Sequence, residues 1–233
     1  MTKTAIITGA NRGIGFRVAQ ALAEQGYQVF MLGRNQEQIN QAASQVPRAE
    51  AFVVDVSNTA SVKAVAAQIS QRIDHLDVLI NNAGVIIETE GFGQPINLDN
   101  VDPELVLETL NINTVGALRM TQAFLTLLEK SPAPRIVNVS SGMGGLSEMG
   151  AGYPAYRLSK TALNALTTFT AADVNNPKLK VNSVCPGWVR TDMGGSQADR
   201  SVDEAIPGIL WAAQLAEDGP TGGFFRDRVR LDW

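Results

Sequence analysis

The sequence predicts an α/β fold in which a doubly wound parallel sheet of about seven strands is covered by helices on both faces. Short segments that are apolar throughout alternate with longer segments whose apolar residues recur at helical spacing. Strands that are apolar throughout are typical of a parallel sheet buried on both faces. No linker, repeat or low-complexity run interrupts the 233 residues, so we expect a single domain over residues 1–233.

The expected elements follow one another in strict alternation. A first strand at residues 4–8 precedes a helix over residues 13–25, in which Ile14, Val18 and Leu22 share one face. The remaining strands are expected at residues 28–32, 51–54, 78–80, 135–139, 181–184 and 223–225, and the remaining helices at residues 36–46, 59–73, 103–129, 153–174 and 203–216. Right-handed crossovers between such strands give a Rossmann-like sheet, which binds its ligand at the carboxyl ends of the strands.

Composition and charge narrow the class of partner. Apolar residues make up 45% of the chain and the formal net charge is −4. This acidity argues against nucleic acid or an anionic membrane as the main partner, since both favour a basic face. The sequence shows no signal peptide and no apolar run long enough to span a membrane, so we expect a cytoplasmic protein.

Two residue types occur once each and exclude further classes. Cys185 has no second cysteine for a disulfide or a cysteine cluster, and we expect a small buried residue and no metal site. His75 is expected in a surface loop. A Ser–His–Asp hydrolase would have to use this histidine, and nothing around it favours that role.

A glycine-rich turn follows the first strand. Gly9, Gly13 and Gly15 let the backbone approach a pyrophosphate, which the start of the following helix attracts through free N–H groups and its dipole. The spacing is GxxxGxG rather than the commoner GxGxxG. A merely tight turn is the alternative interpretation.

The end of the second strand indicates which dinucleotide is bound. An NAD site usually places an acidic residue here, whereas this chain has Gly33 and Arg34. Arg34, with Arg12 from the glycine turn, would suit the 2′-phosphate of NADP(H) through charge and forked donors. The alternative is two solvated surface arginines.

With these motifs in view, the chain resembles the short-chain dehydrogenases/reductases, and among them the carbonyl reductases. The resemblance rests on motifs that occur in the family's order along nearly the whole chain: the glycine turn Thr8 to Gly15, Asp55-Val56, Asn81-Asn82-Ala83-Gly84, Asn113 to Gly116, Ser140-Ser141, Tyr156 to Lys160, and Pro186 to Thr191. It implies four catalytic residues, Asn113, Ser141, Tyr156 and Lys160. It also implies a cofactor site made of Gly9, Asn11, Arg12, Gly13, Ile14, Gly15, Arg34, Asp55, Val56, Asn82, Ala83, Gly84, Tyr156, Lys160, Pro186, Gly187, Val189 and Thr191.

Tyr156 and Lys160 lie four residues apart and share one face of the expected helix. A free tyrosine has a pKa of about 10, and a nearby ammonium together with the oxidised nicotinamide would lower that pKa. Tyr156 would then give its proton to a carbonyl oxygen. Either Ser140 or Ser141 would polarise that carbonyl, because strand residues alternate faces, and the family pattern favours Ser141.

Asn113 falls inside an expected helix, where asparagine is a mediocre helix former. A disturbed helix there would hold a water that relays protons to Lys160, whereas a solvent-facing side chain is the alternative.

The resemblance implies NADPH-dependent reduction of a ketone or aldehyde with apolar bulk, reversible as alcohol oxidation. A non-catalytic NADP(H)-binding sensor on the same fold is the alternative. An extended-branch epimerase would need a larger carboxyl-terminal domain, and a dehalogenase-type lyase would lack the lysine and the glycine turn. The helices at 103–129 and 153–174 would pair subunits in a dimer or tetramer, with a monomer left open.

We expect the substrate pocket to be formed by residues 85–100, 142–152 and 188–201. The second segment is rich in glycine and is therefore expected to be mobile. An apolar lining is expected from Met143, Met149, Tyr153, Trp188 and Met193. Phe224 and Phe225 are expected in the core, and Trp233 has no assigned role.

Overall fold

The computed structural model describes residues 2–90 and 94–233. Within that part of the chain an eight-stranded sheet has the order β10-β9-β8-β7-β4-β1-β2-β3. Its strands are β1 (Thr4–Thr8), β2 (Gln28–Gly33), β3 (Ala49–Val53), β4 (Val78–Asn81), β7 (Arg135–Val139), β8 (Lys180–Val184), β9 (Gly223–Arg226) and β10 (Val229–Arg230). All neighbours pair in parallel except β9 and β10. This confirms the predicted doubly wound Rossmann-like fold.

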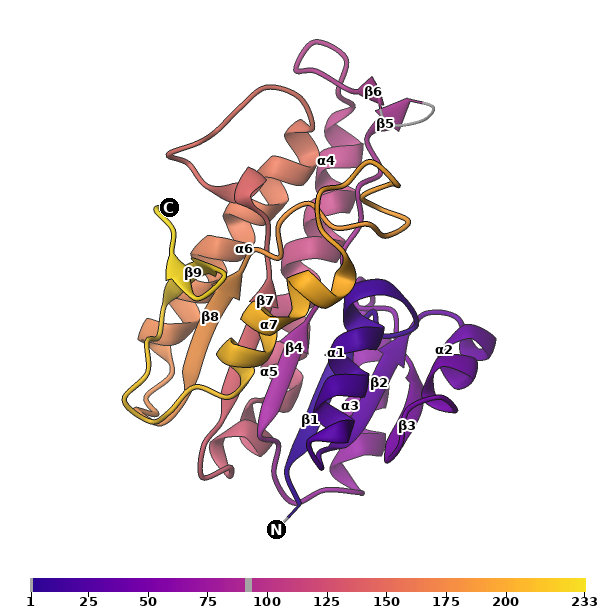
Figure 1. Cartoon of the computed structure of the whole chain (residues 1–233), viewed down its shortest axis with the longest axis vertical. Helices are drawn as coiled ribbons and strands as arrows, with labels where there is room; N and C mark the ends of the chain where they lie inside the picture. The colour runs from indigo at the N-terminus through magenta and orange to yellow at the C-terminus, as the bar shows by residue number, and fades with distance from the viewer. Residues whose placement is uncertain (1, 91–93) are drawn as a thin grey trace.

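The order in which the chain adds strands to the sheet reverses between β1 and β4. The chain winds outward from β1 through β2 to β3, and then from β4 through β7 and β8 to β9 (Figure 1). In folds of this type the ligand binds beside the carboxyl ends of the two strands at such a switch point, which here are β1 and β4.

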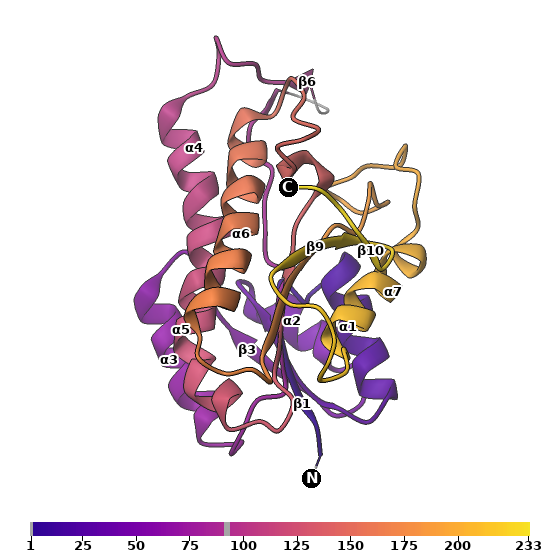
Figure 2. The ribbon, with the colours of Figure 1, turned by 90° about the vertical axis from the view of Figure 1, so that its left-hand side faces the viewer.

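Helices cover both faces of the sheet, as Figure 2 shows. The helices are α1 (Gly13–Glu24), α2 (Gln36–Ala43), α3 (Thr59–Ser70), α4 (Pro103–Leu110), α5 (Gly116–Glu129), α6 (Pro154–Asp173) and α7 (Val202–Ala213). Residues of α1, α2 and α7 pack into one apolar core, and residues of α3 and α5 pack into a second core on the other face. Helix α4 and the start of α6 rise above the carboxyl ends of the strands (Figure 1).

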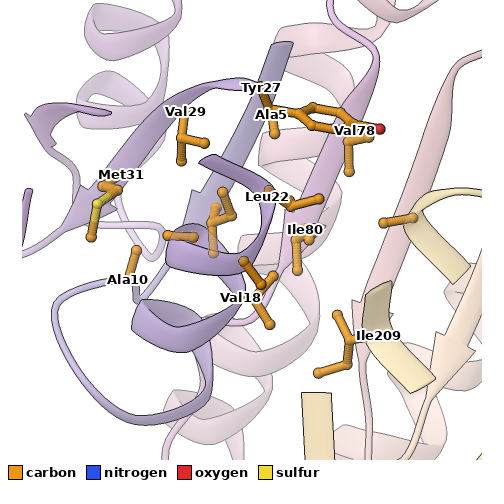
Figure 3. Packing of buried hydrophobic residues seen from close by; sticks show 14 of the residues in the cluster. Ala5, Ala10, Val18, Leu22, Tyr27, Val29, Met31, Val78, Ile80 and Ile209 are labelled. Atoms are coloured by element: carbon orange, nitrogen blue, oxygen red, sulfur yellow. The ribbon is translucent and has the colours of Figure 1, made fainter. Parts of the chain in front are cut away.

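Figure 3 shows the first core, in which side chains from one face of α1 pack on apolar side chains of the strands. Val18 and Leu22 of α1 point toward Ala5, Val29 and Ile80 of three neighbouring strands, and all five are fully buried. Each such aliphatic side chain stabilises the fold by about 1.5–3 kcal/mol relative to an exposed one. This core anchors α1, and with it the glycine turn, on β1.

Most element boundaries agree with the prediction within a few residues, and three short strands were not predicted. β10 extends the sheet by two exposed residues, while β5 (Thr89–Glu90) and β6 (Gln94–Pro95) form a separate antiparallel pair in the expected pocket segment. A strand of two residues is too short to show an alternation of apolar and polar residues, so it cannot be predicted from such a pattern.

The expected long helix at 103–129 divides into α4, a π-helical segment at Asn111–Val115, and α5. The predicted local disturbance at Asn113 is therefore confirmed. Gly116 follows the π segment and packs closely on Val56, since a Cβ at Gly116 would lie 2.9 Å from the Val56 Cγ2 atom.

The remaining single residues mostly follow expectation. Cys185 is buried, as are Phe224 and Phe225. His75 lies in a loop, but its side chain is largely covered because the imidazole Nε2 lies 3.3 Å from the Asp77 carboxylate. Trp233 stacks on Phe224, with ring centroids 5.8 Å apart. No helix in the described ranges is long and apolar enough to cross a membrane.

Candidate active site

The glycine turn is locked by one asparagine of the neighbouring strand end. The Asn82 side-chain amide donates to the carbonyl oxygens of Thr8 and Gly9, at 2.9 and 3.1 Å. The Thr8 hydroxyl in turn accepts the backbone N–H of Asn82 and Ala83. Asn82 therefore acts through the backbone of the turn and joins the ends of β1 and β4.

Two of the three glycines in the turn adopt a backbone conformation that disfavours side chains. Gly9 and Gly13 have φ angles of 63° and 56°. A Cβ at Gly15 would lie 2.4 Å from the Gly9 carbonyl oxygen and 2.5 Å from the Asn82 amide nitrogen. The backbone of the turn and the Asn82 amide therefore leave no room for a side chain at Gly15.

The start of α1 is left without a side-chain cap, although four other helices have one. Asn35, Asn58, Asp102 and Ser201 cap α2, α3, α4 and α7 through their side chains, whereas Arg12 at the start of α1 makes no such bond. Ile14 lies in this first turn. Free N–H groups at a helix start, behind a glycine turn, fit the pyrophosphate of a dinucleotide.

The end of β2 presents Arg34 on an exposed segment, next to the Asn35 that caps α2. Arg12, by contrast, pairs with Asp192, at 2.7 Å between the guanidinium and the carboxylate. Both of these side chains are about 70% exposed to solvent, so the pair is weak and reversible. Asn11 bonds to Gln38 of α2.

Asp55 follows β3 as expected. Hydrogen bonds from the Ser57 hydroxyl and backbone hold the pKa of the Asp55 carboxyl below its usual value, against the effect of burial, with help from Arg34 and Arg119. Arg34 is therefore close enough to Asp55 for its charge to be felt. The adjacent Val56 is buried.

The segment after β8 closes the site from the other side. Gly187 has a φ of 82°, and a Cβ at Gly13 would lie 3.3 Å from the Thr191 methyl group. Val189 is buried and pairs with Arg200 through an isolated parallel β-bridge of the backbone. Thr191 therefore lies against the start of α1.

The two serines after β7 differ in environment. Ser140 is buried and donates to the Asn164 side chain at 2.7 Å. Ser141 is half-buried, accepts the backbone N–H of Met143, and lies close enough to Tyr156 for its hydroxyl to lower the pKa of the phenol. The geometry thus places Ser141, and not Ser140, beside the phenol.

Tyr156 and Lys160 are both buried on the inner face of α6, and the Lys160 ammonium lies 5.6 Å from the centre of the Tyr156 ring. Burial raises the pKa of Tyr156 to about 12, although the hydrogen bond with Ser141 opposes the rise. Burial lowers the pKa of Lys160 to about 8.

In the ligand-free site the Tyr156 shift is opposite to the one expected beside an ammonium and an oxidised nicotinamide together. Desolvation is its largest cause, and the Lys160 ammonium donates to the Val139 carbonyl oxygen, 2.8 Å away. The phenol thus keeps its proton over a wider pH range than a free tyrosine, and the protonated form is the one that a proton donor requires.

Asn113 is buried, which excludes the alternative of a solvent-facing side chain. Its side chain accepts the backbone N–H of Val85 at 2.8 Å and donates to the Val85 carbonyl oxygen and the Ser159 hydroxyl. Gly84 lies between Asn113 and Lys160, since a Cβ there would be 3.3 Å from the amide oxygen and 3.4 Å from the ammonium nitrogen. The Asn113 side chain thus anchors the segment after β4.

The glycine-rich segment after Ser141 is packed on α6 at Gly144, whereas residues 146–151 are exposed. The Gly144 carbonyl oxygen accepts from Thr161 and Asn164, and a Cβ at Gly144 would lie 2.7 Å from the backbone of Lys160. This glycine permits close packing on α6. Of the expected lining, Met149, Trp188 and Met193 are exposed, while Met143 and Tyr153 are half-buried.

Sequence reasoning missed two residues next to this site. The Cys185 sulfur accepts N–H groups of Gly142 and Arg226, behind the serine turn. Glu88 is fully buried and bonds to the backbone of Tyr156. A signal for the second existed: α6 begins at Pro154 without a capping residue, so its N–H groups need an acceptor from elsewhere.

Comparisons with known proteins identify the family of the chain. The model of the short chain dehydrogenase family matches residues 3–201. (-)-Isopiperitenone reductase of Mentha piperita is 30% identical, with 97% of this chain and 96% of that protein covered.

Two solved carbonyl reductases are also similar. The NADPH-bound carbonyl reductase from chicken fatty liver has a TM-score of 0.89 and 30% identity, covering 100% of this chain and 99% of that one. Carbonyl reductase Sniffer of D. melanogaster has the same TM-score and identity, with 100% of both chains covered. The chain therefore belongs to the short-chain dehydrogenase/reductase family of oxidoreductases, which confirms the resemblance seen in the sequence.

The buried lysine leads to a prediction about stability. We expect Lys160→Met to raise the free energy of unfolding of the ligand-free protein by about 1–2 kcal/mol at pH 7, because the buried ammonium is poorly solvated. The measurement is urea denaturation of both proteins between pH 7 and 10.

The pH dependence checks the cause. The lysine pKa is 10.5 in the unfolded chain and about 8 in the folded one, so between these values the unfolded state binds more protons and wild-type stability rises with pH. The advantage of the methionine variant is therefore full below pH 8 and shrinks toward pH 10.5. A difference that stays constant over this window would contradict the explanation.

Proposed function

We propose that this protein is an NADPH-dependent carbonyl reductase that reduces a ketone or aldehyde with apolar bulk, and reversibly oxidises the alcohol. One observation carries the proposal: the buried Tyr156 phenol lies beside the half-buried Ser141 hydroxyl and one helical turn from Lys160, whose ammonium is 5.6 Å from the centre of the phenol ring. A phenol, a hydroxyl and an ammonium in one place are the groups that activate and protonate a carbonyl oxygen.

The residues that would hold the cofactor follow the carboxyl ends of β1, β2, β3, β4 and β8. The uncapped start of α1 suits the pyrophosphate, Arg34 suits a 2′-phosphate, and Thr191 faces the glycine turn. When bound, the nicotinamide supplies the hydride. NADPH-bound relatives of the same fold support this choice of cofactor.

The side chains of the protein would then orient the substrate oxygen and transfer a proton to it. Ser141 donates to the substrate oxygen and orients it, and Tyr156 transfers its phenolic proton to that oxygen as negative charge develops there. The Lys160 ammonium stabilises the phenolate that remains, because charge–charge attraction is strong in a buried site. Asn113 supports this group through its bonds to Val85 and Ser159.

The proton donor can be tested directly. We expect Tyr156→Phe to lower kcat by about 10²–10⁴-fold while NADPH binding is nearly unchanged, because only the phenolic proton is lost. Turnover is followed by NADPH absorbance with ketones, aldehydes, diketones and quinones, and binding by NADPH fluorescence. Retained turnover would refute the role of Tyr156. A wild-type protein that binds NADPH but reduces none of these would revive the sensor.

The choice of cofactor depends on Arg34. We expect Arg34→Asp to shift the ratio of kcat/KM values toward NADH by about tenfold or more, because the carboxylate repels a 2′-phosphate and suits ribose hydroxyls. Lys63→Asp on the exposed side of α3 makes the same change in charge and serves as the control. If the Arg34→Asp variant prefers NADPH over NADH as strongly as the wild-type protein does, Arg34 is excluded as the phosphate-binding residue.

We also propose a homo-oligomer, a dimer or tetramer, that forms through the outer faces of α4 and α6. Leu158 and Phe169 lie three turns apart on one side of α6 and are 52% and 60% exposed, and Leu107 of α4 is 57% exposed. Burial of these exposed apolar side chains against a second copy of the chain would contribute to the stability of such an assembly.

Light scattering after size exclusion tests this assembly. We expect the wild-type protein to be oligomeric and Leu158→Lys/Phe169→Lys to be monomeric, because two charges would be buried in the interface. Val229→Lys, on exposed β10, should leave the mass unchanged. A monomeric wild-type protein would contradict the proposal.

A further inference from the structure

A buried carboxylate lies in the segment that follows β4, outside the set of groups described for the reaction. Glu88 is 0% exposed, although charged side chains are almost never fully buried without a partner. No salt bridge to it is found among residues 2–90 and 94–233. Its partners are instead two backbone N–H groups.

Those two groups belong to the first turn of α6. One Glu88 oxygen accepts the N–H of Ala155 at 2.6 Å, and the other accepts the N–H of Tyr156 at 2.5 Å. Both oxygens of the carboxyl group act as acceptors, so Glu88 binds the first turn of α6 at two points. The positive end of the helix dipole adds to the stabilisation.

Helix α6 has no cap of its own. Tyr153, which precedes it, is in the left-handed region with a φ of 57° and gives no side-chain cap, and Pro154 has no N–H. Helices α2, α3, α4 and α7 are capped by the residue directly before them. Glu88, which lies 67 residues before Ala155 in the sequence, therefore provides the cap that the residues next to the start of α6 do not provide.

The same segment is attached to the site at two further points. Asn113 binds both the N–H and the carbonyl oxygen of Val85, three residues before Glu88. The N–H of Tyr153 donates to the Ile96 carbonyl oxygen at 3.1 Å. Val85, Glu88 and Ile96, which belong to the segments expected to line the substrate pocket, thus connect the π-helical segment with the start of α6.

We propose that Glu88 is a positioning residue for Tyr156: by capping α6 at the N–H of Tyr156 itself, it sets where the phenol lies relative to Ser141 and links the substrate segment to the proton donor. This inference rests on the proposed carbonyl reductase function. A misplacement of reacting groups by about 1 Å is able to lower a rate by about 10²-fold, so a cap on the backbone of the proton donor has consequences for turnover.

The test compares Glu88→Gln with Glu88→Asp. In the glutamine variant one acceptor oxygen becomes an NH₂ donor that faces a backbone N–H, while size is kept. We expect kcat per NADPH-binding site to fall by about 10–10²-fold, with much smaller changes in the KM of the carbonyl substrate and in NADPH affinity. Glu88→Asp keeps the charge and should recover part of kcat. Counting binding sites removes any contribution from unfolded protein.

Hydrogen exchange at peptides that cover residues 154–160 gives a readout that does not depend on activity. We expect faster exchange there in Glu88→Gln than in wild type. Asp102→Ala, which removes the exposed carboxylate cap of α4, is the matched control and should leave kcat and exchange in α6 unchanged.

The outcomes separate the two proposals. A wild-type protein without carbonyl reductase activity overturns the proposed function, and exchange alone then decides whether Glu88 holds α6. If exchange at 154–160 is unchanged in Glu88→Gln, the proposal for Glu88 is overturned in either case. If the wild type is active, an undiminished kcat in Glu88→Gln, or an equal loss in Asp102→Ala, also overturns it.

Discussion

The site depends on a row of buried polar contacts that fixes how α6 lies against the ends of β7 and β8. Lys160 donates to the Val139 carbonyl oxygen, Asn164 bonds to Ser140 and Gly144, and Thr167 bonds to Asn138 and Ser183. These α6 residues repeat at intervals of four and three, so they share one helix face with Tyr156. An apolar face would tolerate a slip or rotation of the helix, whereas each buried polar group that loses its partner costs about 1–3 kcal/mol. The polar row therefore selects one register, and that register brings Tyr156 beside Ser141.

The two helices that meet the site start without local caps, and the protein treats them differently. The start of α1 has no side-chain cap and suits the pyrophosphate of the proposed cofactor, whereas two N–H groups of α6 are bound by Glu88. The positive end of a helix favours negative charge in both places. At α1 that charge would belong to the ligand and would contribute to its affinity. At α6 it belongs to the protein, and we propose that it sets the position of a side chain.

The electrostatics of the site work against the stability of the empty protein. Burial favours the neutral forms of both Tyr156 and Lys160, so the phenol keeps its proton and the ammonium is held less firmly than in water. Strain of this kind is common where function requires it and is offset by packing elsewhere. The two apolar cores on either side of the sheet provide that packing.

The sequence by itself determined the sheet, the helices that cover it and the motifs at the strand ends, because period, turn glycines and strand-end positions are local properties of the chain. It also indicated the disturbed helix at Asn113, from a poor helix former in a long helical pattern. Only the tertiary structure decided what depends on contacts between distant segments. It directed Arg12 to Asp192, raised the pKa of Tyr156 by burial, and brought Glu88 to the start of α6 across 67 residues. No pattern within a short window records such contacts, since desolvation and capping from afar arise only when the chain has closed on itself.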